Sequence, residues 1–287
     1  MYQAPRRTGY RTAPPTKKTL YSMKRTGLVV TVAALLTAAL LVVFFLLRHK
    51  DAAAPGKKTA ASQAGTAQTG QPAPQPGGAP GFNRNKYATN DAASLWMVVN
   101  KKHQLNPKDY TPADLVVPKI PLRSNITSTE KYVRSDMAGP LESLIAAAAN
   151  NGVHLNLQSG YRSYSFQVSL YNGYVKQQGQ AAADRQSARP GYSEHQTGLA
   201  ADLGGTSKPA CNVAQCFVAT PEGTWLAANA YTYGFIIRYT ADKESITGYE
   251  YEPWHIRYVG TDLAAEMHAT GISTLEEFFG VAGGQSY

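Results

Sequence analysis

Two short segments of the chain bring together the residue types that hydrolytic zinc sites use. His195 and Asp202 lie in the first segment, and Glu252 and His255 lie in the second. Two imidazoles and one carboxylate can hold Zn²⁺ with its fourth position open for water, and a second carboxylate beside them can accept the proton of that water. Together these residues are the inventory of a metallopeptidase.

The first segment also has an ordinary interpretation, a turn histidine followed by a surface aspartate. Gly191 and Gly198 bracket His195, and the residues around Asp202 are small and apolar. This pattern indicates a loop that enters a buried strand, with Asp202 at the end of the strand. A carboxylate beside an apolar core needs a cation as its partner, which favours a metal ligand.

The second segment, taken alone, is a strand end with one exposed acid. Pro253 argues against a helix, so this is not the helical motif in which two histidines bind zinc. In an extended chain, residues two apart share a face. Glu252 and His255 therefore converge only if Pro253 turns the backbone.

Three segments together resemble the zinc D-alanyl-D-alanine carboxypeptidases of the VanY type, which belong to the LAS metallopeptidases. They are residues 159–163 (SGYRS), 193–202 (SEHQTGLAAD) and 252–255 (EPWH). The similarity runs from about Ala92 to about Gly280, in the order and spacing of that family. The resemblance implies roles for four residues, namely the Zn²⁺ ligands His195, Asp202 and His255 and the general base Glu252.

The resemblance also implies substrate contacts for Arg162 and, more weakly, for Gln167 and Ser193. A carboxypeptidase must recognise a free C-terminal carboxylate or stabilise an oxyanion beside it, and a planar guanidinium does either with paired charge-assisted hydrogen bonds. Arg162 lies between a predicted strand and a helix capped by Ser163, and such a turn projects from the end of a sheet. A salt-bridged surface arginine, an exposed helix glutamine and a turn serine are the ordinary alternatives.

Residues 91–287 suffice for one hydrophobic core and are too few for two comfortable domains. Apolar spacing predicts helices over 95–100, 143–149, 163–177, 224–231 and 263–268, and strands over 153–157, 235–239 and 254–259. Helices followed by clustered strands indicate a single α+β domain with the metal on a sheet face. The resemblance implies a hedgehog/D,D-peptidase-like fold, with a central antiparallel sheet carrying the zinc site.

The amino-terminal part contains a segment that predicts membrane attachment. Residues 27–47 are 21 uncharged, mostly apolar residues, enough to form one transmembrane helix across a ~30 Å hydrocarbon core. A signal peptide cleaved near residues 52–54 is the alternative, but the apolar run and the segment before it are long for one. The preceding 25 residues carry seven basic side chains and no acid, which predicts a single-pass cell-membrane protein with an extracytoplasmic catalytic domain.

The composition changes along the chain. Residues 51–90 are rich in Ala, Gly, Pro, Gln and Thr with hardly any large apolar residue, so they predict a disordered tether. The predicted organisation is a basic cytoplasmic tail (1–26), a transmembrane anchor (27–47), a disordered linker (48–90) and a zinc carboxypeptidase domain (91–287).

The formal net charge of +9 belongs to the amino-terminal part. Residues 1–90 hold 13 Lys and Arg and one acid, whereas the remainder holds 15 basic and 18 acidic residues. The domain therefore lacks a basic surface that tracks phosphates, and we expect no nucleic-acid partner. We expect a monomer whose basic tail contacts anionic lipid.

The two cysteines, Cys211 and Cys216, lie in a polar loop just after the Asp202 strand. In an oxidising extracytoplasmic setting we expect them to form a disulfide. Two free thiols are the alternative. A second metal site is not expected, because no nearby Cys/His pair completes one.

The sequence thus predicts a zinc-dependent D-alanyl-D-alanine carboxypeptidase that removes the terminal D-alanine from peptidoglycan stem peptides. L,D-carboxypeptidase or endopeptidase activity of the same family stays open, as does a role in wall remodelling or in glycopeptide resistance. From another class of function, the domain would be a non-catalytic wall-binding module with structural zinc. Structural zinc sites are usually closed by four protein ligands, so three ligands and a spare acid favour the enzyme.

Overall fold

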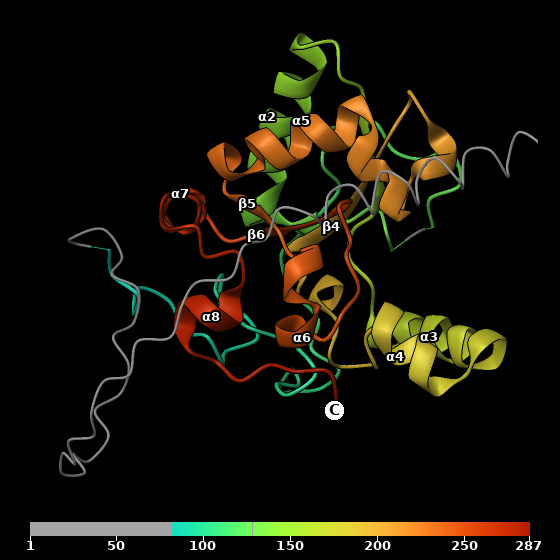
Figure 1. Cartoon of the computed structure of the whole chain (residues 1–287), viewed down its shortest axis with the longest axis vertical. Coiled ribbons are helices and arrows are strands. Elements are labelled where there is room, and N and C mark those ends of the chain that lie inside the picture. The colour runs from blue at the N-terminus through green and yellow to red at the C-terminus, as the bar shows by residue number, and fades with distance from the viewer. Residues whose placement is uncertain (1–81, 128) are drawn as a thin grey trace, which may run out of the picture. The chain divides into compact units, whose positions relative to one another are not determined.

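A computed structural model describes residues 82–127 and 129–287. Their centre is a four-stranded antiparallel sheet (Figure 1). In order across the sheet, its strands are β3 (Leu155–Ser159), β4 (Ala200–Gly205), β6 (His255–Tyr258) and β5 (Phe235–Ile237). A second small sheet pairs β1 (Leu115–Val116) with β2 (Val133–Arg134). The expected α+β class with an antiparallel sheet is confirmed.

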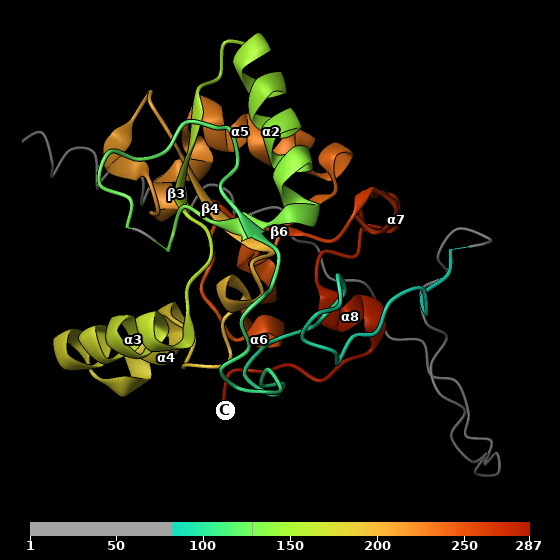
Figure 2. The same cartoon turned by 180° about the vertical axis from the view of Figure 1, so that it is seen from behind.

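Helices cover both sides of the sheet. The α-helices are α2 (Ser135–Asn150), α3 (Tyr164–Gln178), α4 (Gln180–Gln186), α5 (Pro221–Asn229), α6 (Glu244–Thr247), α7 (Thr261–Thr270) and α8 (Leu275–Phe279). Short 3-10 helices are η1 (Glu194–Thr197), η2 (Pro209–Cys211), η3 (Gln215–Ala219), η4 (Ala230–Tyr233) and η5 (Ala241–Lys243). Both views place α2 and α5 together on one side of the sheet, with α6 and the α3–α4 pair on the other (Figures 1 and 2).

The side of the sheet that α2 and α5 cover holds the main hydrophobic core. Strand β3 shows why, because its residues alternate so that Leu155 and Leu157 are buried against the helices. From α2, Met137, Leu141 and Leu144 are fully buried in the same cluster. This packing fixes the sheet and so fixes whatever the strands carry on their other side.

Strand β4 is buried on both faces, and its residues are correspondingly small. A Cβ atom on Gly205 would lie 2.3 Å from Cδ of Glu222, so a larger residue there would force the Glu222 side chain to move. Asp202, the one charged residue of β4, is the cross-strand partner of His255 on β6. Asp202 therefore lies inside the strand, not at its end as expected, and the register of the sheet brings the carboxylate beside the imidazole.

Most predicted elements are present with shifted bounds, but the helix predicted over 95–100 is wrong. That segment consists of turns and extended chain. Trp96 and Val98 pack into the core beside α7 and α8, whereas Met97 and Val99 pack into a separate cluster. Alternation between two clusters is what an extended chain produces, and the apolar run did not distinguish it from a helix.

The expectation of a single-pass membrane protein is corrected here. Across residues 82–127 and 129–287, the structure contains no helix long and apolar enough to span a bilayer. Residues 27–47, on which the expectation rested, lie outside the described residues, as do the expected tail and most of the linker.

Residues 82–90, assigned to the linker, already contact the domain. Nη1 of Arg84 donates a 2.6 Å hydrogen bond to the carbonyl of Phe278, and the ring of Phe82 stacks on Trp96 with centroids 5.8 Å apart. The composition of residues 51–90 as a whole did not predict these contacts, because they depend on single aromatic and basic side chains at the end of that segment.

The expected disulfide is confirmed. Cys211 and Cys216 are joined with an S–S distance of 2.08 Å and close a loop after β4. The side chain of Asn212 in this loop accepts a hydrogen bond from the backbone N–H of Gly205 at 2.8 Å. The loop is thereby attached to the end of the strand that carries Asp202.

Candidate metal and catalytic centre

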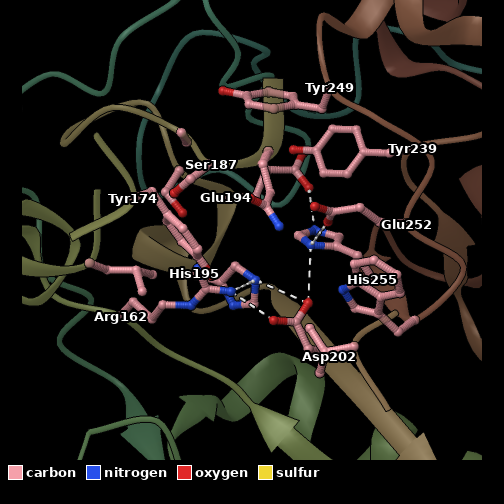
Figure 3. A pocket seen from close by; sticks show the side chains of 16 residues that line it. Arg162, Tyr174, Ser187, Glu194, His195, Asp202, Tyr239, Tyr249, Glu252 and His255 are labelled. Atoms are coloured by element: carbon pink, nitrogen blue, oxygen red, sulfur yellow. Dashed lines mark hydrogen bonds and ion pairs between the residues drawn. The ribbon is translucent and has the colours of Figure 1, made fainter. Parts of the chain in front are cut away.

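The residues singled out in the sequence, except Gln167, meet in one small cavity against the sheet (Figure 3). Its volume is about 110 Å³. His195 lies in η1, immediately before β4, and Asp202 lies within β4. His255 begins β6, and Arg162 lies between β3 and α3. The cavity wall includes Arg162, Ser193, Glu194, His195, Asp202, Tyr239, Tyr249, Glu252 and His255.

Local backbone features bring these residues to the cavity. Gly198 ends η1 in the left-handed conformation, with φ of 69°, where a side chain would be strained. The chain can then turn directly from His195 into β4. At the second segment, the backbone N–H of His255 donates to the carbonyl of Glu252 at 3.1 Å. This confirms that the chain turns at Pro253 and brings the acid back towards the imidazole.

Three donor atoms converge as zinc ligands do. Oδ1 of Asp202 lies 3.3 Å from Nε2 of His195 and 3.3 Å from Nδ1 of His255, and all three atoms lie within 4.8 Å of one another. Donor atoms about 2.0–2.1 Å from a tetrahedral zinc are about 3.3–3.4 Å apart. Within the described residues, Oδ1 of Asp202 is buried and has no hydrogen-bond partner. The donor set therefore fits a zinc ion.

The remaining ring nitrogens are already engaged. Nδ1 of His195 lies 2.7 Å from the carbonyl of Gly160, which only accepts hydrogen bonds. Nε2 of His255 lies 3.3 Å from Oε2 of Glu194. If both nitrogens carry the ring proton, the lone pairs of Nε2 of His195 and Nδ1 of His255 point to the shared space beside Asp202.

Burial and nearby charges together lower the pKa values of Asp202 and His195. Burial alone would raise the pKa of Asp202, but His195 and the Arg162 guanidinium outweigh it and hold that pKa well below its usual range. Burial, with the positive charge of Arg162 beside it, lowers the pKa of His195 to about 4. Asp202 is thus kept ionised and His195 is kept neutral, the states in which both side chains bind metals.

The pKa values of His255 and Glu252 are raised. Burial would lower the pKa of His255, yet the carboxylates of Asp202, Glu194 and Glu252 face its ring and raise the pKa well above its ordinary value. Burial raises the pKa of Glu252, and the charge of Asp202 raises it further although His255 opposes them. A carboxyl group with a raised pKa holds a proton more readily, which suits a group that accepts one during a reaction.

Arg162 points directly into this cluster. Its Nη2 donates to Oδ2 of Asp202 at 2.7 Å and lies 2.5 Å from Nε2 of His195, while its Nε donates to Oγ of Ser159 at 3.0 Å. Its side chain is 14% exposed, so it is not a surface arginine. A nitrogen that binds zinc cannot also accept from Arg162, so metal binding requires the guanidinium to move off His195. It would then be free for a negatively charged substrate oxygen.

The structure places Ser193 and Gln167, the two weaker expectations for substrate contact, differently. Ser193 is buried and lines the cavity. Gln167 is fully buried and does not line it. Its amide nitrogen instead donates to Oγ of Ser187 at 3.1 Å and to the carbonyl of Ala188 at 2.7 Å. Because Ser187 and Ala188 form part of the wall, Gln167 supports the cavity from behind and does not lie in solvent.

Sequence reasoning missed Glu194, which is fully buried between His255 and two arginines. Arg238 donates to its Oε1 at 2.8 Å through Nε, and Arg257 donates to the same atom at 2.8 Å through Nη1. Burial would raise the pKa of Glu194, but the two guanidinium charges outweigh it and lower the pKa. The signal was a carboxylate directly before His195 in a segment whose other residues are mostly small, apolar or uncharged.

Comparison of the sequence with known proteins gives matches to carboxypeptidases. Residues 130–261 match the family VanY, D-alanyl-D-alanine carboxypeptidase. YodJ of Bacillus subtilis (strain 168), a candidate carboxypeptidase, is 41% identical over 186 residues, which cover 65% of this chain and 67% of YodJ. A D-alanyl-D-alanine carboxypeptidase of Enterococcus faecium is 36% identical, and the match covers 51% of this chain but only 44% of that protein.

Two kinds of solved structure are similar. The LD-carboxypeptidase LdcB shares 40% identity with a TM-score of 0.62, covering 67% of this chain and 88% of LdcB. The D,D-pentapeptidase VanY of a VanB-type vancomycin resistance cassette, solved as a variant with Zn(II), shares 30% identity with a TM-score of 0.53. That match covers 66% of this chain and 99% of the solved one.

Proposed function

The chain belongs to the VanY family of D-alanyl-D-alanine carboxypeptidases, and we propose that it removes the terminal D-alanine from peptidoglycan stem peptides. The observation that carries this proposal is the convergence of His195, Asp202 and His255, at distances that suit zinc, in a cavity that also contains Glu252 and Arg162. The related VanY structure that contains Zn(II) supports the same metal here.

We propose that Nε2 of His195, Oδ1 of Asp202 and Nδ1 of His255 hold the zinc ion. When bound, zinc polarises a carbonyl and lowers the pKa of a water molecule to ≈ 7. Among the described residues, the group of side chains close enough to share a metal contains three members. A structural zinc site would normally be closed by four protein ligands, so three ligands support a catalytic site over a wall-binding module.

Glu252 is the proposed general base. Its Oε2 lies 3.4 Å from Nδ1 of His255, so it lies beside the ligands, and Asp202 already supplies the carboxylate of the set. Its raised pKa favours uptake of a proton from the attacking water and return of that proton to the leaving amine. A positioned acid–base group of this kind typically contributes 10²–10⁴-fold in rate.

Arg162 is the proposed anion-binding residue. Its guanidinium is held at the cluster by Ser159 and Asp202 and presents N–H donors towards the cavity. It would bind either the terminal carboxylate of the peptide or the oxygen on which negative charge develops as the carbonyl is attacked. Both roles need a cation at this place in the cavity, and amidation of the substrate carboxylate distinguishes them.

An L,D-carboxypeptidase is the second candidate, and one observation favours it. The LD-carboxypeptidase LdcB is 40% identical with a TM-score of 0.62, against 30% and 0.53 for the D,D-pentapeptidase VanY. An endopeptidase of the same family is the third candidate.

One comparison of rates tests the choice. The purified full chain is incubated with a pentapeptide that ends in D-Ala-D-Ala and with the tetrapeptide that ends in a single D-alanine, and kcat/KM is measured for both by mass spectrometry of the products. The proposed D,D activity predicts faster release from the pentapeptide. Faster release from the tetrapeptide would move the enzyme to the L,D class, and cleavage inside an amidated peptide would make it an endopeptidase.

A further inference from the structure

The carboxylate of Glu194 makes three contacts, and its two oxygens divide them. Oε1 accepts hydrogen bonds from Arg238 and from Arg257, both at 2.8 Å. Oε2 faces Nε2 of His255 at 3.3 Å. The side chains of Glu194, Arg238 and Arg257 are all 0% exposed. None of the catalytic roles proposed above involves Glu194.

The two arginines are themselves fixed. Arg238 donates to both oxygens of Glu276 on α8, at 2.9 and 2.7 Å, and Glu276 also accepts from Nδ2 of Asn100 at 2.9 Å. Arg257 donates to the backbone carbonyls of residues 95 and 97 at 3.1 and 2.9 Å. The network therefore connects η1, β6, α8 and the segment before residue 101, and it determines which way each oxygen of Glu194 faces.

This arrangement determines the hydrogen bond available to His255. A carboxylate oxygen only accepts, so Nε2 of His255 can bond to Glu194 only by carrying the ring proton. The lone pair of the neutral ring is then on Nδ1, which lies 3.3 Å from Oδ1 of Asp202. For the other imidazole, the backbone carbonyl of Gly160 supplies the equivalent acceptor.

We propose that Glu194 is a positioning residue for the metal centre: clamped by Arg238 and Arg257, it holds His255 in the ring orientation and tautomer that present Nδ1 to zinc. The inference rests on the proposed zinc-dependent function. It adds a residue that does not touch substrate or metal and acts through His255.

The substitution Glu194→Gln tests the proposal because the two oxygens of the Glu194 carboxylate have different partners: Oε1 faces two arginines and Oε2 faces His255. Both arginines are donors, so the introduced amide must place its oxygen where Oε1 lies now. Its NH₂ group then faces Nε2 of His255, and a donor meets a donor. The ring satisfies that contact only by moving its proton to Nδ1, the atom that must bind the metal.

Glu276→Gln is the matched control. It removes the same charge by the same change, in the same buried network and on the same arginine, but Glu276 has no contact with His255. Loss of charge balance and loss of folding stability should therefore be similar in the two variants. Only the effect that passes through His255 should differ.

The experiment measures the zinc dissociation constant of the full chain by competition with a chromophoric chelator, for wild type and both variants. The visible absorption spectrum of Co²⁺ in the same site is recorded alongside. Glu194→Gln should weaken zinc binding by 10–100-fold and change the Co²⁺ spectrum, whereas Glu276→Gln should stay near wild type. Equal zinc affinity in all three proteins, or equal weakening in the two variants, would overturn the proposal.

A measurement on the wild type covers the case in which Glu194→Gln fails to fold. In the zinc-loaded protein, ring-nitrogen NMR should show one ligand histidine with its proton on Nδ1 and one with its proton on Nε2. Two ligand histidines with the proton on Nδ1 would refute the role of Glu194. A wild type that binds no zinc would instead refute the proposed function, so the two failures are distinguishable.

Discussion

Replacement of Glu252 by glutamine separates the proposed base from the proposed ligands. Glu252 lies 3.4 Å from Nδ1 of His255, and its side chain is 16% exposed in the cavity. Glutamine keeps the size and hydrogen-bonding capacity of the side chain but cannot accept the proton of an attacking water. Because His195, Asp202 and His255 are untouched, zinc content and Tm should stay near wild type.

The expected loss is kinetic. A positioned acid–base group contributes 10²–10⁴-fold, so kcat should fall by that factor, equivalent to about 3–5 kcal/mol of activation free energy. Stopped-time assays on the pentapeptide, with zinc measured in the same samples by atomic spectroscopy, give both quantities. KM should change little, because Glu252 is not assigned to substrate binding.

Glu250→Gln is the control for this prediction. It makes the same change two residues earlier, at a partly exposed side chain that pairs with Arg185 at 3.0 Å. It should leave kcat and zinc content unchanged. If Glu252→Gln loses its zinc, Glu252 is a fourth ligand and the site is closed; if it keeps both zinc and full kcat, another group is the base.

Three further changes should each affect one property. Arg162→Ala should reduce kcat/KM severely. If Arg162 binds the carboxylate, an amidated peptide should reproduce much of that loss in the wild type. Equal cleavage of free and amidated peptides would exclude that role. Because the pKa of His255 is raised and zinc binds the deprotonated ring, protons compete with zinc from a higher pH than for a free imidazole. Zinc affinity, measured by chelator competition, should therefore fall as the pH falls, and a constant affinity between about pH 8 and about pH 6 would contradict the shift. Cys211→Ser combined with Cys216→Ser opens a short loop and should lower the free energy of unfolding by about 2 kcal/mol in urea titrations. Zinc content should stay at the wild-type level. Loss of zinc would show that the loop positions Asp202.

The sequence identified the donor residues because their chemistry is specific and local. His195 and Asp202 lie in one segment, and Glu252 and His255 lie in another, so spacing alone suggested two half-sites. What brings the halves together is the pairing of β4 with β6, which places Asp202 opposite His255. That pairing is a long-range property of the sheet, and local periodicity does not encode it.

The sequence did not predict the burial of Glu194 or of Gln167, and the physical cause is the same for both. Arg238 and Arg257 lie 44 and 63 residues from Glu194, so the residues near Glu194 in the chain do not show which cations it pairs with. The burial of Gln167 also depends on residues that are distant in the sequence. On a helix of weak amphipathicity its polar side chain suggested solvent or substrate, yet the fold buries it behind Ser187. Burial of polar groups depends on partners that only the tertiary structure supplies.

The most direct test of the proposed function is metal-dependent release of one amino acid. The purified chain, stripped of metal with a chelator and checked for residual zinc, is incubated with a pentapeptide that ends in D-Ala-D-Ala, before and after zinc is restored. The zinc site of His195, Asp202 and His255 predicts no hydrolysis without metal, and a product shorter by one D-alanine once zinc is added back. Full hydrolysis by protein confirmed to be free of metal would contradict it.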